Sequence, residues 1–168
     1  MIIKISILYS WFVRMVTIML PNIPIFMRFR GFLYSLMMKD CGKNFQVSSS
    51  TVINSLTKLS VGKNVYIGPN TIVIGQDIEI NDEVLIGPSS LLSTGNHTMK
   101  NDSFRFGPPK RGQIIIGRGA WIAGNCSVVS GAILPAASVL AAGSVLNKAY
   151  MESHSMYAGV PAKYIKKL

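Results

Sequence analysis

A six-residue rhythm constrains the fold of this chain more than any other feature of its sequence. From Ile116 the blocks IGRGAW, IAGNCS, VVSGAI, LPAASV and LAAGSV follow one another, and each begins with an aliphatic residue. An earlier tract runs VGKNVY and IGPNTI from Val61 and, after a slip of one residue, IGQDIE, INDEVL, IGPSSL and LSTGNH from Ile74. This period matches neither the helical repeat of about 3.6 residues nor the strand repeat of about 2.

The content of each block indicates how such a chain folds. The first aliphatic side chain points inward, and the Gly, Ala, Asn, Asp or Pro that follows suits a tight corner. Three blocks per coil build a triangular prism of short parallel strands, in which each coil buries its aliphatic row against its neighbours. The sequence therefore predicts an all-β fold, a left-handed parallel β-helix. Residues 98–115 lack the period, and we expect an extruded loop there.

The first forty residues differ from the rest. They hold six of the nine methionines and no acidic residue before Asp40. Arg14 and Pro21 interrupt the apolar runs, which are shorter than the roughly 20 residues of a membrane span, and no small-residue cleavage site follows. We expect an apolar, basic and helical N-terminal segment at 1–42 and a β-helix domain at 43–168. Two interpretations of the segment stay open: helices packed on the body or its oligomer partners, and a peripheral contact of 1–40 with a membrane.

Charge and residue types narrow the partners. The net charge of +10 implies an anionic partner, whether nucleic acid, a lipid surface or a phosphate-bearing small molecule. No nucleic-acid-binding motif or aromatic stacking surface is recognisable, so we expect no nucleic acid. Two cysteines and two histidines without metal-ligand spacing predict no metal and reduced thiols in a cytoplasmic protein.

Several motifs in the right order resemble a known family. They are STGNH, GAWIAGNCSVVSGAIL, LAAGSVLNK and the closing YAGVPAKYIKKL. Residues 40–168 resemble the hexapeptide-repeat acyltransferases, and among them the sugar O-acetyltransferases of the maltose, galactoside and bacterial-polysaccharide type. The stretch RFRGFLYSLMMKDCGKNFQV looks more like the polysaccharide and O-antigen acetyltransferases. The resemblance implies acetyl transfer from acetyl-CoA, as co-substrate, to a saccharide hydroxyl, in a homotrimer whose active sites lie between two prisms.

The chemistry of this transfer points to particular residues. A hydroxyl that attacks a thioester needs a base, and imidazole has a suitable pKa. His97, at the break in the repeat, matches the catalytic histidine of the family, which implies direct transfer with His97 as general base. Trp121 matches a tryptophan near the acetyl-CoA thiol in related enzymes, with packing as its alternative role. Gly124, where many relatives carry serine, is a candidate backbone donor to the oxyanion. A backbone carbonyl or an acid between Asp77 and Glu83 would orient the base.

Coenzyme A carries a pyrophosphate, a 3′-phosphate and a thin pantetheine arm, so its site needs cations and small residues. The resemblance implies that these are Ala123, Gly124, Ala141, Ala142, Asn147, Lys148, Pro161, Lys163 and Lys166. A solvated basic tail is the alternative interpretation of these lysines. Five basic residues surround the loop and favour an anionic acceptor or a membrane surface: Lys100, Arg105, Lys110, Arg111 and Arg118.

Other functions fit the residues less well. An N-acetyltransferase acting on a nucleotide-linked amino sugar would share the coenzyme groove and differ only at the acceptor. Cys126 stands inside a repeat block, which favours a small core residue over an acetyl-accepting nucleophile, and His154 has the context of a surface residue. A non-enzymatic β-helix scaffold leaves the coenzyme-type tail unexplained. We expect a cytoplasmic enzyme, at the inner face of the membrane if 1–40 binds lipid.

Overall fold

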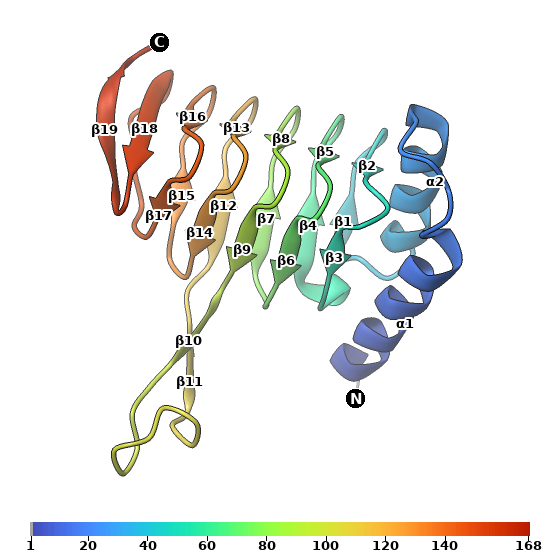
Figure 1. Cartoon of the computed structure of the whole chain (residues 1–168), viewed down its shortest axis with the longest axis horizontal. Coiled ribbons are helices and arrows are strands. Elements are labelled where there is room, and N and C mark those ends of the chain that lie inside the picture. The colour runs from blue at the N-terminus through green and yellow to red at the C-terminus, as the bar shows by residue number, and fades with distance from the viewer. Residues whose placement is uncertain (1) are drawn as a thin grey trace.

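Three parallel sheets form the walls of a triangular prism in the computed structural model, which describes residues 2–168 (Figure 1). Met1, which belongs to the segment expected at 1–42, lies outside the described residues. We name the walls sheets A, B and C. Sheet A consists of β1 (Asp40–Cys41), β4 (Leu59–Val61), β7 (Ile78–Ile80), β12 (Ile114–Ile116) and β15 (Ile133–Leu134).

The other two walls repeat this arrangement. Sheet B consists of β2 (Gln46–Val47), β5 (Tyr66–Ile67), β8 (Leu85–Ile86), β13 (Trp121–Ile122), β16 (Val139–Leu140), β18 (Ser155–Gly159) and β19 (Ala162–Lys167). Sheet C consists of β3 (Val52–Ile53), β6 (Ile72–Ile74), β9 (Leu91–Ser93), β14 (Ser127–Val129) and β17 (Val145–Leu146). The chain visits A, B and C in turn, and only β19 closes the prism antiparallel to its neighbour β18.

The interior of the prism holds the aliphatic residues that open the blocks. Ile67, Ile86, Ile122 and Leu140 lie one in each of four successive coils of sheet B and are fully buried. Complete burial of such a side chain contributes about 1.5–3 kcal/mol each. The parallel β-helix that the repeat predicts, with its N-terminal helices and extruded loop, is confirmed.

One part of the repeat was read in the wrong register. The buried residue of β6 is Val73, and Ile74, which was expected to open a block, is only half-buried. The slip of one residue occurs after Val73, at the corner that contains Gly75. Gly75 has a φ of +112° and lies so close to Thr94 that a Cβ would overlap the threonine hydroxyl. An aliphatic run, IVI, offers two adjacent candidates for the inward position, and the corner decides between them.

Two helices cover the first coil of the prism. Helix α1 (Ile2–Thr17) contacts β3 and the short 3-10 helix η1 (Leu56–Lys58), and α2 (Pro24–Ser35) packs on β2. Gly31 lies against Phe45, whose carbonyl oxygen a Cβ would overlap. Val13 and Tyr34 join the core of the prism, and burial raises the pKa of Tyr34 to about 12. In residues 2–168 no helix has both the length and the apolar character to cross a membrane.

A buried arginine ties the helices to the first coil. Arg30 is fully buried, and its guanidinium donates to the carbonyl oxygens of Val47, Thr17 and Leu20, at 2.5, 3.2 and 3.1 Å. Burial lowers the pKa of this side chain. The hydrogen bonds compensate part of the cost of taking the charge out of water, and they join both helices to β2.

A two-stranded arm leaves the prism between β9 and β12. Strands β10 (Gly95–His97) and β11 (Pro109–Arg111) pair antiparallel, with His97 opposite Pro109. Both strands are exposed at every residue, and in Figure 1 the arm extends below the prism. The loop expected at 98–115 is therefore present, but its bounds differ: the stem begins at Gly95, and Ile114 and Ile115 already belong to β12 of sheet A.

Candidate active site

His97 is the last residue of β10, at the end of the paired stem farthest from the prism. The arm follows β9 of sheet C and returns to β12 of sheet A, so the stem that carries His97 departs from the edge between these two sheets. Sequence analysis placed this residue at the break of the repeat, and the break is the point at which the chain leaves the prism. Its exposure leaves the imidazole accessible to a ligand from outside the chain.

Gly107, which sequence analysis did not single out, fixes the arm beside His97. A Cβ at Gly107 would overlap the carbonyl oxygen of Thr98, and the Thr98 hydroxyl donates to the Pro108 carbonyl at 2.6 Å. The two sides of the arm can therefore close together only if residue 107 is glycine. The signal available in the sequence was the Gly-Pro-Pro tract of residues 107–109 within an aperiodic loop.

A line of small residues runs along the edge between sheets B and C. Ala123 and Gly124 form the corner after β13, and Ala141 and Ala142 form the equivalent corner after β16. The corners stack, because the Gly143 N–H donates to the Gly124 carbonyl at 3.0 Å. A Cβ on Gly124 would lie 3.5 Å from Pro88, an ordinary contact, so the corner also has room for serine.

Two further predicted residues accompany this edge. Trp121 lies on β13 of sheet B, directly before the corner, and its side chain is 48% exposed. Pro161 lies in the turn that joins β18 to β19, at the next level of the prism. Trp121 and the small residues at this edge therefore lie together, as a site for a coenzyme arm requires.

Asn147 and Lys148 lie elsewhere. They follow β17 at the edge between sheets C and A, the edge from which the arm departs two coils earlier, after β9. The Lys148 ammonium lies 5.1 Å from the centre of the Tyr150 ring. One copy of the chain thus divides the predicted residues between two edges, with His97, Asn147 and Lys148 at one and Trp121 with the small residues at the other.

Lys163 and Lys166 lie on β19, the last strand of the prism. Lys163 pairs with Ala158 and Lys166 with Met156, and an irregularity in the register lies between Met156 and Tyr157. Residues three apart on a regular strand point to opposite faces. Here their partners are two apart on β18, because β19 has one extra residue at the irregularity. Both lysines therefore point to the same face of the hairpin.

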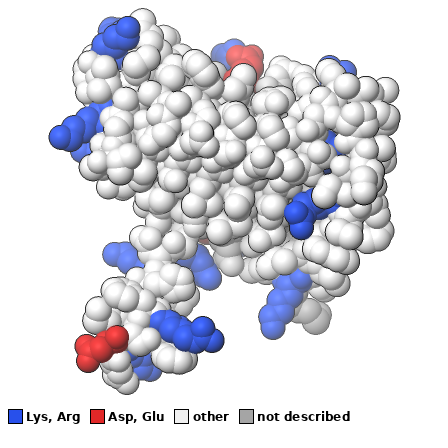
Figure 2. Space-filling model, viewed as in Figure 1, with Lys and Arg blue, Asp and Glu red and all other residues white. Residues whose placement is uncertain are grey.

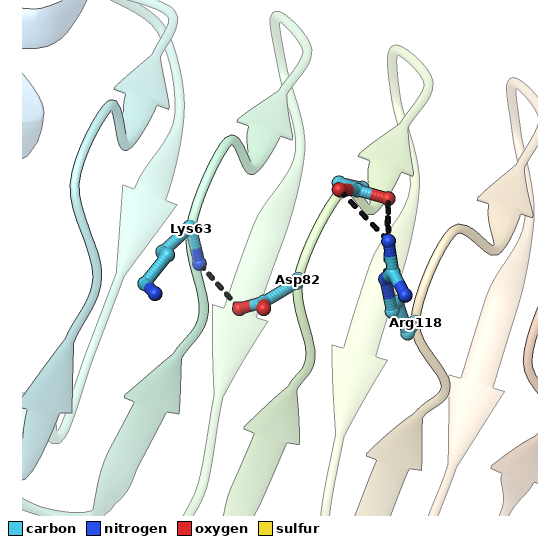
Figure 3. A network of polar contacts seen from close by, with 4 residues as sticks. Lys63, Asp82 and Arg118 are labelled. Atoms are coloured by element: carbon cyan, nitrogen blue, oxygen red, sulfur yellow. Dashed lines mark hydrogen bonds and ion pairs between the residues drawn. The ribbon is translucent and has the colours of Figure 1, made fainter.

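Asp82 and Glu83, two of the acids considered as partners of His97, are engaged elsewhere. The Asp82 carboxylate accepts the Lys63 backbone N–H at 2.7 Å (Figure 3), and Arg118 binds both oxygens of Glu83 at 3.0 and 3.1 Å. These contacts lie at the edge between sheets A and B, whereas the arm departs from the edge between sheets C and A. Arg118 therefore does not belong to the basic residues around the loop, contrary to the expectation from its position in the sequence.

The arm itself carries a dense positive charge. Lys100, Arg105, Lys110 and Arg111 lie on it, with Asp102 as the one acid of residues 95–113. Figure 2 shows these basic side chains around the arm below the prism. Arg105 lies 5.8 Å from the centre of the exposed Phe106 ring. The arm combines cations and exposed apolar side chains next to His97.

Cys126 and His154 have the environments that their sequence contexts predict. Cys126 is buried in the corner after Gly124, and its thiol donates to the Ala141 carbonyl at 3.1 Å. Burial raises the pKa of this thiol, which leaves it protonated at neutral pH. His154 is exposed at the corner before β18. Among residues 2–168 no three His, Cys, Asp or Glu side chains gather as metal ligands.

Comparisons with known proteins agree with this architecture. The chain is 29% identical over 133 residues to the galactoside O-acetyltransferase of Escherichia coli (strain K12), an alignment that covers 79% of this chain and 65% of that protein. The chain therefore spans just under two thirds of the length of this relative. No family model matches the sequence.

Solved structures show the same fold. A hexapeptide-repeat acetyltransferase of Vibrio cholerae, solved with acetyl coenzyme A, has a TM-score of 0.83 at 23% identity and covers 98% of this chain and 88% of its own. A maltose O-acetyltransferase of Clostridium difficile 630 has a TM-score of 0.80 at 21% identity, with 98% and 89% covered. The chain has the fold of the hexapeptide-repeat acetyltransferases and is related in sequence to a galactoside O-acetyltransferase.

Proposed function

From the hexapeptide-repeat fold and the relationship to a galactoside O-acetyltransferase, we propose that this chain is an acetyl-CoA-dependent O-acetyltransferase acting on a saccharide. The observation that carries the proposal is the pairing of an accessible histidine, on the arm that leaves the repeat, with a line of small residues on a neighbouring edge. The first supplies a base, and the second supplies a channel for a thin acyl-carrying arm.

The proposal includes a homotrimer with each active site divided between two copies. His97 and Trp121 lie at different edges of one prism, with sheet C between them. A site that needs both groups is incomplete in one copy. When two parallel prisms stand side by side, the edge with His97, Asn147 and Lys148 faces the edge with Trp121 and Ala142 of its neighbour, and rotation closes the arrangement.

The reaction is a direct transfer in a ternary complex. The His97 imidazole removes the proton of the acceptor hydroxyl while the hydroxyl oxygen attacks the thioester carbonyl. The carbonyl oxygen becomes an oxyanion, for which the backbone N–H of Gly124 is the donor we propose. Collapse of this intermediate expels the thiolate of coenzyme A, which receives the proton from the imidazolium. Cys126 takes no part, because its buried, protonated thiol is a poor nucleophile.

The rest of the coenzyme meets the residues beyond the reacting end. Ala123, Ala141 and Ala142 leave room for pantetheine, and Pro161 continues this edge. Lys163 and Lys166, on one face of the terminal hairpin, supply cations to the nucleotide phosphates, and Asn147 and Lys148 come from the neighbouring copy. Acetyl-CoA is the co-substrate, and the proposed chemistry uses no metal.

The acceptor is an anionic saccharide, of the kind found in bacterial surface polysaccharides and O-antigens or their precursors. The four cations of the arm, with a single acid, support this class. We place the reaction in the cytoplasm, where acetyl-CoA and such precursors are made.

Transfer of a ¹³C-labelled acetyl group tests the function. The full chain is incubated with labelled acetyl-CoA and, separately, a galactoside, maltose, an acidic surface oligosaccharide and a nucleotide-linked amino sugar. We expect an acetyl ester, identified by its carbonyl chemical shift and its lability to mild base, and the fastest turnover with the acidic oligosaccharide. An amide product on the amino sugar would identify an N-acetyltransferase instead. Absence of both transfer and coenzyme binding would reject the proposal.

A further inference from the structure

Helix α1 turns its small and polar side chains toward the prism. Its buried residues are Ser6, Ser10, Val13 and Thr17. The Ser10 hydroxyl donates to the Ile53 carbonyl of β3, and the Thr17 hydroxyl donates to the Val13 carbonyl within the helix. Val13 and the partly buried Tyr9 are the hydrophobic side chains by which the helix packs on the core.

The large apolar side chains of α1 lie on the opposite side. We call this the outer face, and it consists of Ile5, Leu8, Trp11, Phe12, Met15 and Val16. Leu8 is 65% exposed and Phe12 55%. A helix that covers a folded domain in water ordinarily buries its apolar stripe and exposes its polar one. The polarity of α1 is reversed, so its outer face suits contact with a second apolar phase.

Helix α2 buries Met27 and Tyr34, yet it also carries a stripe of exposed apolar side chains. Arg30 and Gly31 point inward with Met27 and Tyr34, while Ile25, at 65%, and Phe32, at 58%, are exposed. Phe29 and Leu36 extend the same exposed stripe. The two helices contact each other at one end of the prism, as Figure 1 shows, so both apolar stripes belong to the same end of the molecule.

The charges around these stripes identify the occupant. The charged residues of positions 1–39 are Lys4, Arg14, Arg28, Arg30 and Lys39, and the first acid is Asp40. Only Arg30 of these is fully buried. A second copy docked by the same surface would oppose cations to cations with no acid to neutralise them. A bilayer of anionic phospholipids complements both the apolar stripes and the cations that lie among and beside them, which include Lys4 on the outer face of α1.

We propose that α1 and α2 lie in the plane of an anionic membrane surface, with the outer face of α1 at the boundary between headgroups and acyl chains. Helix α1 has 16 residues, a length of about 24 Å, against about 30 Å of hydrocarbon, which suits lying in the surface rather than crossing. The inference goes beyond the proposed function and does not depend on it, because vesicle binding is measured without acetyl transfer.

Vesicle flotation of the full chain tests the proposal. We expect the protein to float with vesicles of phosphatidylcholine and phosphatidylglycerol, to float weakly with phosphatidylcholine alone, and to be partly released by high salt. Lys4→Gln and Arg14→Gln should each weaken binding by about fivefold. Leu8→Gln combined with Phe12→Gln should abolish it. The matched control is Met151→Gln, which removes an apolar side chain that is 82% exposed outside the helices and should bind as the wild type does.

Fluorescence of Trp11 tests the orientation without altering the outer face. Trp121→Phe leaves Trp11 as the one tryptophan of the chain. Its emission should shift to the blue on addition of anionic vesicles and should be quenched by brominated acyl chains. The proposal would be overturned if the protein with an unaltered outer face did not float with the vesicles and if the emission of Trp11 did not shift. Outer-face variants that bind vesicles normally would also overturn it, as would variants that change only the oligomeric state in sedimentation velocity, which would identify a second copy as the occupant.

Discussion

At the scale of single residues, two glycines near His97 differ in whether they have room for a side chain. Gly107 closes the arm against Thr98, whereas Gly95, on the paired strand, has open space around its Cβ position and no left-handed φ. We expect Gly107→Ala to displace the arm and lower kcat by about tenfold or more, because a displacement of about 1 Å misplaces a base. Gly95→Ala should leave kcat unchanged. Equal effects of the two substitutions would contradict the role given to Gly107.

Cys126 gives a second prediction at this scale, which concerns thiol reactivity. Burial raises the pKa of Cys126, and it raises that of Cys41 to about 11. Since the thiolate is the reactive form, both thiols should react with an aromatic disulfide reagent more slowly than free cysteine at neutral pH and faster as the pH rises. Cys126→Ala should keep turnover within about a factor of two. Loss of turnover, with trapping of an acetyl-thioester on Cys126 of the wild type, would show a covalent mechanism.

The sequence was informative about residues whose position in the fold follows from local pattern. His97 interrupts the rhythm, and Cys126 stands at a regular position within it, so each could be placed before any coordinates. The repeat alone did not predict that His97 and Trp121 lie at different edges of the prism. The arm inserts residues between sheets C and A, so the edge of each residue depends on which sheet each block belongs to. The contact of Gly107 with Thr98 depends on how the arm folds back, which no period describes.

At the scale of elements, the repeat predicted the strands well and the corners less well. Ile115 pairs with Ile133, so this coil takes the ideal eighteen residues, whereas Asp40 pairs with Ser60 and Ser60 with Glu79. The first two coils are therefore two residues and one residue longer. The extra residues form η1 and the corner at Gly75, and corners accept insertions because they carry few of the buried side chains. Strand positions are fixed by burial, which is the property that the sequence displays.

The terminal hairpin of β18 and β19 gives the prediction at this scale. Because its irregular register brings Lys163 and Lys166 to one face, the double variant Lys163→Glu with Lys166→Glu should weaken coenzyme A by more than tenfold. It should weaken dephospho-CoA less, since that ligand lacks the 3′-phosphate. Calorimetric titration of both ligands measures the difference. Lys4→Glu with Lys39→Glu is the control for net charge. An equal loss of coenzyme affinity in both double variants would mean that the lysines of β19 act only through the net charge of the protein.

For the N-terminal helices, the sequence predicted the position of the segment but not which face of each helix points toward the prism. Their apolar and basic composition predicted a helical segment, and it left packing and membrane contact open. The structure contains evidence for both, because Val13, Met27 and Tyr34 pack inward while Leu8 and Phe32 point outward. The division of the chain at residues 42 and 43 stays a prediction. Deciding the orientation required the position of Arg30, a charged residue that a hydropathy pattern would place on the surface.

At the scale of the whole molecule, the proposed trimer unites the site and the membrane-facing end. Three parallel prisms related by rotation about an axis along the prism present all three pairs of helices to the same side. Three weak peripheral contacts then act together on one surface, which raises the overall affinity well above that of one copy. The arms and coenzyme grooves repeat around the same axis. The proposed arrangement would bring an anionic glycan held at a membrane close to three equivalent sites.

The most direct test of the account is activity in mixed oligomers. His97→Ala alone should lower turnover by about 10²- to 10⁴-fold while coenzyme binding and the oligomeric state stay normal. Ala142→Trp alone should block the coenzyme groove. Co-expressed in equal amounts, the two inactive variants should recover about one quarter of wild-type turnover, because a quarter of the sites combine His97 of one copy with an open groove of its neighbour. A mixture as inactive as its components would contradict a site shared between copies.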